Sequence, residues 1–282
     1  MSNKYRRTGS QLSARKVMVA TLLSTPPVDL QPAAFGGADG GFPFDGGFPA
    51  DAGFSGDGGF VTVPGQTLAF VFFGTRTSEN LDSPPEGVAG ATVTVAAVDG
   101  ATATLKDDGK CDYSKSSVDD GTFKNESGKT YDFTASSGGA SFVGEVERAP
   151  GLERISQLHP PAGFISKAAN TPFTFTRPDP PSGQERNLGF VSVYPINSDG
   201  QKAEPTYTNV PNTPVQFLKL IALPSEWKKT EVVVPAEAFP AVNQTYVIAF
   251  QAVKSGGPKS DNLFTGSALL VGTADIGVVR TH

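Results

Sequence analysis

The chain has 282 residues and a formal net charge of −5, and it contains 32 glycines, 23 prolines, 20 phenylalanines and a single cysteine. This length accommodates two domains of ordinary size. One cysteine excludes an internal disulfide and a cysteine-rich metal site, while the acidic charge argues against nucleic acid as a partner. Glycine and proline recur between short runs of Val, Thr and Phe, a pattern that predicts an all-β protein.

The first thirty residues combine basic and apolar side chains. Every charged residue before Asp29 is basic, and an apolar run follows at 17–23. One interpretation is a targeting segment, because a basic start with an apolar run resembles a secretion signal and Arg6-Arg7 resembles a twin-arginine signal. The other is a basic, apolar arm that is retained in the mature protein. No other stretch is long and apolar enough to span a bilayer, so an integral membrane protein is not expected.

A six-residue unit repeats four times in residues 39–60. In a polyproline-II conformation, with about three residues per turn, aspartate and phenylalanine alternate along one edge and glycine lines another. Such a segment is either a flexible glycine-rich linker or an arm whose evenly spaced aromatic rings bind a partner. We predict that residues 1–60 form an extended Gly/Phe-rich arm with these partner-binding residues: Phe42, Phe48, Phe54 and Phe60.

Residues 61–151 are predicted to form a first β-sandwich. An apolar run at 68–73 suits a strand, and 91–98 alternates apolar and polar side chains as a half-buried strand does. Asp99-Gly100 predicts a hairpin that joins 91–98 to 101–105. Two later strands are marked by same-face aromatic and apolar residues: Tyr131 with Phe133, and Phe142 with Val146.

This part of the chain resembles the carboxypeptidase-regulatory-like domain, a small transthyretin-like β-sandwich. The resemblance lies in "VAGATVTV" (88–95), "LKDDG" (105–109), "GTFKNESGKTYDFTASSGG" (121–139) and the closing "APG" (149–151). In that family the first strand begins at Gly-Ala, and a Gly-x-x-Tyr-x-Phe strand precedes a last strand that ends in proline. The resemblance implies a non-catalytic accessory or surface module.

Residues 152–186 are Pro-rich and are predicted to be a linker and first strand that lead into a second sandwich, 187–282. Its expected strands alternate apolar and polar residues between Pro and Gly turns: 187–196, 215–223, 229–235, 245–253 and 264–272. Their spacing predicts a sandwich of about seven strands. The portion from Trp227 to residue 253 resembles the latter half of a fibronectin-type or immunoglobulin-like domain. That resemblance implies a tyrosine corner at Tyr246 and places Trp227 at the edge of the core.

The sequence offers few residues for catalysis. His159 and His282 stand in no metal-ligand or general-base spacing, and the chain has no Gly-x-Ser-x-Gly nucleophile elbow. Cys111 lies beside lysines, but without a histidine base we interpret it as an incidental cysteine. The Gly-rich stretch neither follows a strand nor opens a helix, so it is no cofactor loop. We therefore predict no catalytic residue, no cofactor and no enzyme activity.

Asp-rich turns are the remaining candidates for a metal, because hard oxygen ligands are what Ca²⁺ requires. They contain five aspartates: Asp107, Asp108, Asp112, Asp119 and Asp120. Neither turn fits the Asp-x-Asp-x-Asp-Gly loop, and Asp-Gly is ordinary hairpin chemistry. The prediction is solvated turns, with no metal ligand assigned.

These observations predict two tandem β-sandwich domains behind a Gly/Phe-rich N-terminal arm, as in bacterial surface proteins. The expected function is that of a non-enzymatic structural or surface protein in an extracytoplasmic fibre, coat or envelope assembly, where the arm contacts other subunits. A decorating role on a virion is a variant of this hypothesis. The alternative is an adhesion module whose sandwich loops bind a carbohydrate or a protein, with Trp227 as a candidate contact.

Overall fold

The computed structural model of the protein describes the following residues: 9–31, 34, 61–78, 83–98, 100–109, 111–116, 125–196, 204–211, 216, 219–220 and 223–282. Strands dominate this part of the chain, so the predicted all-β class is confirmed. The hexad repeat, with Phe42, Phe48, Phe54 and Phe60, lies outside the described residues.

The first half of the chain contributes a short helix and ten strands: α1 (Gly9–Ser13), β1 (Lys16–Thr25), β2 (Val28–Leu30), β3 (Val61–Val63), β4 (Gln66–Thr75), β5 (Glu86–Gly87), β6 (Thr92–Ala97), β7 (Thr102–Asp107), β8 (Asp112–Ser116), β9 (Tyr131–Ser137) and β10 (Ala140–Val146). The second half contributes these strands and 3₁₀ turns: η2 (Ser156–Leu158), β11 (Ile165–Lys167), β12 (Phe173–Thr176), β13 (Leu188–Pro195), β14 (Tyr207–Thr208), η3 (Pro224–Trp227), β15 (Glu231–Val234), η4 (Ala236–Ala238), β16 (Thr245–Pro258) and β17 (Ala268–Thr281).

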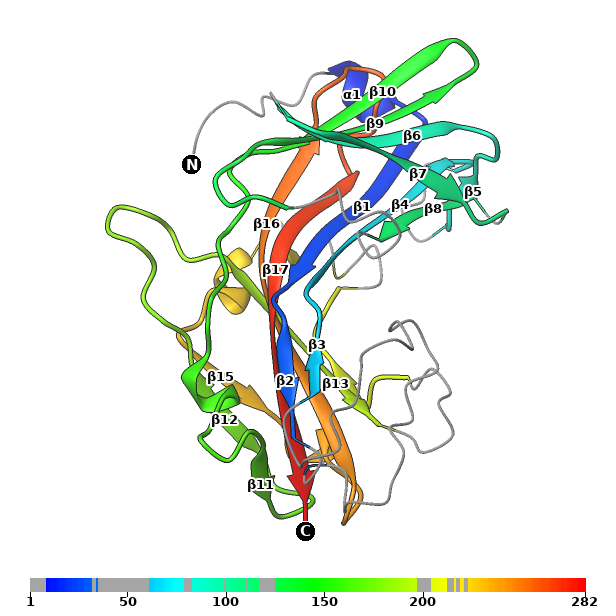
Figure 1. Ribbon diagram of the computed structural model, residues 1–282. Coiled ribbons are helices and arrows are strands. Elements are labelled where there is room, and N and C mark those ends of the chain that lie inside the picture. Colours follow the sequence, from blue (N-terminus) through cyan, green and yellow to red (C-terminus); the bar gives the residue numbers. More distant parts are fainter. Residues whose placement is uncertain are drawn as a thin grey trace.

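The strands β1 and β4 to β10 lie in the upper half of the molecule in Figure 1, where they pack around one core. The hydrogen-bonded order runs β17-β1-β4-β8-β7-β6-β9-β10-β16, so the path leaves the β16–β17 hairpin on one side and returns to it on the other. Side chains that alternate inward along these strands enclose one core, which includes Met18, Val71, Val93 and Phe133.

A second core lies in the lower half, between β13, β16 and β17 and the two-stranded sheet β12–β15. Its members include Phe175, Val234, Phe239, Tyr246 and Phe250. The rings of Phe175 and Phe250 meet edge to face with centroids 5.5 Å apart, a favoured aromatic geometry. A third, smaller cluster joins β13, β16 and β17 to the segment that contains Trp227.

The long hairpin β16–β17 belongs to both halves. One edge of β17 pairs in parallel with β1 from Val19↔Ala268 onward, and its far end pairs in parallel with β11. β16 pairs with β13 along the lower half and with β10 at its end. Because the same two strands complete both cores, the expected division into two separate tandem sandwiches is not confirmed.

The apolar run near the N-terminus was expected to be part of an extended arm. It is instead a strand within the large sheet. β1 lies between β4 and β17, and its inward side chains Met18, Ala20 and Leu22 are buried. Cleavage near residue 25, which a removed targeting segment requires, would take this strand out of the sheet and open the first core to water. The structure therefore favours the second interpretation, in which residues 16–25 are retained.

Most of the strands expected from alternation are confirmed. The 91–98 and 101–105 segments pair as a hairpin, with Val93↔Leu105 and Ala96↔Thr102. The strands at Tyr131, Phe142, 187–196, 229–235 and 245–253 are present as β9, β10, β13, β15 and β16. The strand expected at 215–223 is wrong where the chain is described, because Gln216, Lys219 and Leu220 are helical and Leu220 is buried in the third cluster.

Two tyrosines use their hydroxyls in the same way. Tyr246 accepts the N–H of Ala241, five residues upstream, at 3.0 Å, which is the contact expected of a tyrosine corner. Tyr131 accepts the N–H of Glu126, also five residues upstream, at 2.7 Å. Each hydroxyl thus satisfies a backbone donor in the turn that precedes its strand.

Candidate functional site

The residues singled out in the sequence do not come together in one site. Cys111 is a free cysteine at a turn with φ 68°, and its side chain lies against the backbone of Gly87. The Ser166 hydroxyl lies 3.3 Å from Nδ1 of His282. Asp119 and Asp120 lie outside the described residues.

The Asp-rich turn at the end of β7 uses its carboxylate to order the backbone. Asp107 accepts the N–H groups of Gly109 at 2.8 Å and Gly90 at 3.3 Å, and these bonds hold the pKa of the carboxyl below its usual 3.8. Within the described ranges, no group of three or more His, Cys, Asp or Glu side chains is placed to hold a metal ion. The turn thus acts as a hairpin closure in this part of the chain.

His159, which stood alone in the sequence, contacts a buried carboxylate on β17. Its Nε2 lies 2.8 Å from Oδ1 and 2.9 Å from Oδ2 of Asp275, whose side chain is fully buried. The N–H of Ile155 donates to the same carboxylate at 2.7 Å, and the guanidinium of Arg154 lies 3.5 Å away. A carboxylate only accepts, so we assign the proton of the imidazole to Nε2.

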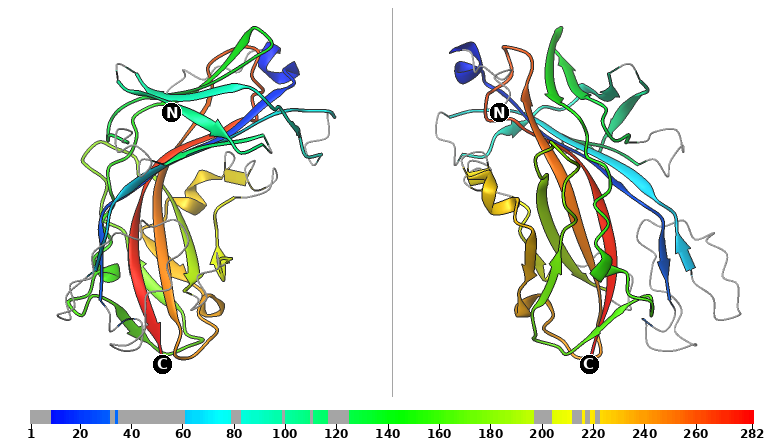
Figure 2. Two further views of the ribbon diagram at one scale, coloured as in Figure 1. Left: turned by 45° about the vertical axis from the view of Figure 1, so that its right-hand side comes forward. Right: turned by 90° about the vertical axis from the view of Figure 1, so that its left-hand side faces the viewer.

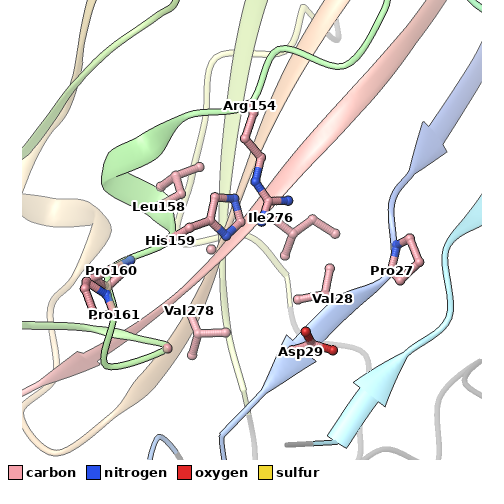
Figure 3. A pocket seen from close by; sticks show the side chains of 12 residues that line it. Pro27, Val28, Asp29, Arg154, Leu158, His159, Pro160, Pro161, Ile276 and Val278 are labelled. Atoms are coloured by element: carbon pink, nitrogen blue, oxygen red, sulfur yellow. The ribbon is translucent and has the colours of Figure 1, made fainter.

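The His159 side chain opens onto a cavity of about 210 Å³ between β2, the loop at 154–163 and β17 (Figure 3). Apolar walls come from Pro27 and Val28 on one side and from Pro160 and Ile276 on the other. Asp29 also lines the cavity, and it accepts a hydrogen bond from Thr62 of β3 at 2.6 Å.

The contacts beside the cavity fasten a loop to the sheet. Among the described residues that line the cavity, none is a serine, threonine, cysteine or lysine. The buried carboxylate is contacted by donors from three positions of the loop, Arg154, Ile155 and His159. Gly277 lets the loop approach, because a Cβ there would lie 2.9 Å from Leu158. These contacts hold the loop on β17.

Sequence reasoning missed this cluster, since His159 and Asp275 are 116 residues apart. One signal was present: Asp275 interrupts an otherwise apolar strand, and a charged residue in a buried strand needs a partner. The pattern indicates that a donor exists without indicating which residue supplies it.

A second feature is an apolar surface on the outside of the first core. We define the apolar face as five side chains of β1 and β4 that point away from that core: Val19, Leu23, Leu68, Phe70 and Phe72. Val19 lies opposite Phe72, and Leu23 lies opposite Leu68. Leu68 is 42% exposed and Phe70 is 40% exposed, while the other three are half-buried.

Trp227, the candidate loop contact for a binding module, is occupied within the chain. It ends η3 and packs against the third cluster, and its indole N–H donates to the carbonyl of Asn209 at 3.4 Å. Its backbone carbonyl accepts from the buried Arg177. These contacts place it at the edge of a core, as the sequence predicted.

No protein-family model matches the chain, and the search of curated proteins found no match. Within the described ranges, no helix has the length and apolar character needed to cross a membrane.

Proposed function

We propose that the protein is a non-enzymatic structural subunit of an extracytoplasmic or cell-surface assembly, and that the Phe repeat between β2 and β3 contacts other subunits. The two sandwich-like cores supply the rigid body. Within this proposal the first core remains a candidate carboxypeptidase-regulatory-like module and the second a candidate fibronectin-like module.

The observation that carries the proposal is the ribbon formed by β2 and β3. These strands pair with each other, from Val28↔Val63 to Leu30↔Val61, and with no other named strand. In the right-hand view of Figure 2 they diverge from β17. The ribbon therefore holds together the ends of the segment that contains the repeat, and past β2 the chain is fastened to β16 at the buried Ala34, whose carbonyl accepts from the Thr245 hydroxyl at 2.6 Å.

This arrangement suits an element that binds another molecule. A loop closed by its own hairpin can be long without a large cost to stability, because closure entropy grows slowly with loop length. Evenly spaced phenylalanines are costly to leave in water and are the kind of side chain that fills a partner's pocket. Support for the proposal thus comes from where the ribbon presents the repeat and from the chemistry of the repeat itself.

The test replaces residues 35–60 by a Gly/Ser segment of the same length and keeps β1, β2 and β3. Removing residues 1–60 entirely is unsuitable, because that deletion also removes β1 from the sheet. We expect the replaced chain to unfold with the wild-type midpoint in urea and to stay monomeric in sedimentation velocity, where the wild type associates. A replaced chain that associates as the wild type does would refute the proposed function.

A further inference from the structure

We propose that the apolar face of β1 and β4 binds the Phe repeat of a second copy of this chain. This inference rests on the proposed function and names the surface that receives the arm. Three observations support it: the apolar outer side chains of β4, the dimensions of the repeat, and the distance between the end of the repeat and the chain's own face.

The outer side of β4 differs from that of β7, a strand around the same core. On β7 the outward residues are Thr102, Thr104 and Lys106, which is the polar pattern expected where a sheet faces water. On β4 the outward residues are Leu68, Phe70 and Phe72. The buried side of β4 is apolar as well, so both faces of this strand have the composition of an interior.

The neighbouring strands extend this surface. Thr21 of β1 lies between Phe70 of β4 and Leu270 of β17 in the register of the three strands. Leu270 is buried in the third cluster, beside Trp227. The apolar face is therefore continuous with a packed cluster at one edge and exposed at Leu68 and Phe70. An exposed apolar surface of this kind marks a site of protein contact.

The repeat has matching chemistry and length. In an extended polyproline-II conformation its phenylalanines are about 19 Å apart, and its glycines allow the backbone to approach a surface closely. From Leu68 to Phe72 the face measures about 13 Å along the strand. One face therefore accepts one unit, and the four units of one chain can engage more than one neighbour, which raises the overall affinity by multivalency.

The strands β3 and β4 separate the end of the repeat from the chain's own face. Val61 is seven residues before Leu68 and nine before Phe70, so the distances along extended β3 and β4 are about 23 Å and about 30 Å. Phe60 directly precedes Val61 and falls short of both, while Phe54 reaches back at most about 24 Å and so arrives only at the Leu68 end. The last unit thus cannot cover its own face, whereas all four units can reach the face of another copy.

The experiment separates donor and acceptor in the full chain. The donor carries Leu68→Thr and Phe70→Thr, which give β4 the outward threonines found on β7, and keeps the repeat. The acceptor keeps the apolar face and has residues 35–60 replaced by Gly/Ser. A matched control, Val233→Thr, removes an exposed apolar side chain of β15, which is 53% exposed and lies in the other half.

We expect donor alone and acceptor alone to be monomeric, and their mixture to form complexes in sedimentation velocity. Each lost apolar contact is expected to weaken self-association of the wild type by about tenfold or more. The Val233→Thr chain is expected to associate as the wild type does. A donor that self-associates with wild-type affinity, or a mixture that stays monomeric, overturns the inference. The proposed function survives either result as long as the acceptor alone is monomeric.

A second measurement needs no change in β4. The photoreactive residue p-benzoylphenylalanine replaces Phe48, and this chain is mixed with an isotope-labelled wild type before irradiation. Cross-links to residues 68–72 of the labelled chain are expected in the mass spectrum. Cross-links confined to the unlabelled chain carrying the probe would show that the repeat binds its own body, and would overturn the inference.

Discussion

The side chain of Arg177 is completely buried at the end of β12, and its replacement by methionine is expected to destabilise the fold strongly. Its guanidinium donates to Glu153 at 2.9–3.1 Å and to the backbone carbonyl of Asn187 at 2.9 Å. It also lies over the ring of Phe250, 5.0 Å from the centroid. Burial lowers the pKa of Arg177 and Glu153 opposes that shift, so the group remains a cation at neutral pH.

The magnitude follows from what Arg177→Met leaves behind. Removing one partner of a buried ion pair costs about 3–5 kcal/mol, because the other charge stays in the protein without compensation. Glu153 is 14% exposed and keeps a hydrogen bond from the Asn187 amide, which favours the lower end of that range. A loss of about 3 kcal/mol is a large fraction of the stability of an ordinary domain.

Equilibrium unfolding in urea measures this cost, with Trp227 fluorescence as the probe, since the Trp227 carbonyl accepts from Arg177. Lys228→Met is the control, because Lys228 pairs with Glu185 at the surface and such pairs contribute at most about 1 kcal/mol. A double variant in which Glu153 also becomes methionine should be more stable than Arg177→Met alone. If Arg177→Met costs no more than the control, the reasoning from the buried Arg177–Glu153 pair is refuted.

Three further variants test individual contacts. Asp275→Asn is expected to cost about 1–3 kcal/mol in urea unfolding, because the amide offers one acceptor oxygen in place of two and carries no charge to strengthen the bonds from His159 and Ile155; an unchanged midpoint contradicts the fastening role. Tyr131→Phe and Tyr246→Phe should each cost about 1 kcal/mol, and equal stability to wild type would show that water replaces the hydroxyl. The lowered pKa of Asp107 means that its stabilising effect is present above pH 3.8 and is lost as the pH falls through the folded value; a titration midpoint by NMR at or above 3.8 contradicts this.

Local strand structure was predictable because it depends on neighbours in the sequence. Alternation of Val93 and Val95 with threonines predicts a strand with one buried face, and the dipeptide Asp99-Gly100 predicts the hairpin in which Val93 pairs with Leu105. The segment 215–223 shows the limit of the method, because a short apolar run fits a buried helix turn as well as a strand. There the packing of Leu220 against the third cluster decides the conformation.

Long-range pairing was not predictable from the same signals. β1 and β17 run in parallel. The backbone N–H of Met18 donates a hydrogen bond to the hydroxyl of Ser267, which is 249 residues away in the sequence. A parallel pair has no connecting hairpin whose turn residues would announce it. The same holds for Asp275, whose need for a partner is visible in its strand while the identity of that partner, His159, depends on the tertiary path of the loop.

The run "LAFVFF" at 68–73 contains information of a different kind. A strand with one face in water is expected to alternate, and a continuous apolar run is typical of a strand covered on both faces. β4 has the second pattern, yet only Ala69, Val71 and Phe73 lie in the core of the single chain, while Leu68 and Phe70 remain exposed. β6 and β7, by contrast, alternate as their burial requires, and β1 beside β4 shares the apolar pattern through Val19 and Leu23. Under the proposed assembly the discrepancy disappears: the outward residues of β4 are interior positions of the complex, and the aromatic ring that covers them belongs to another copy.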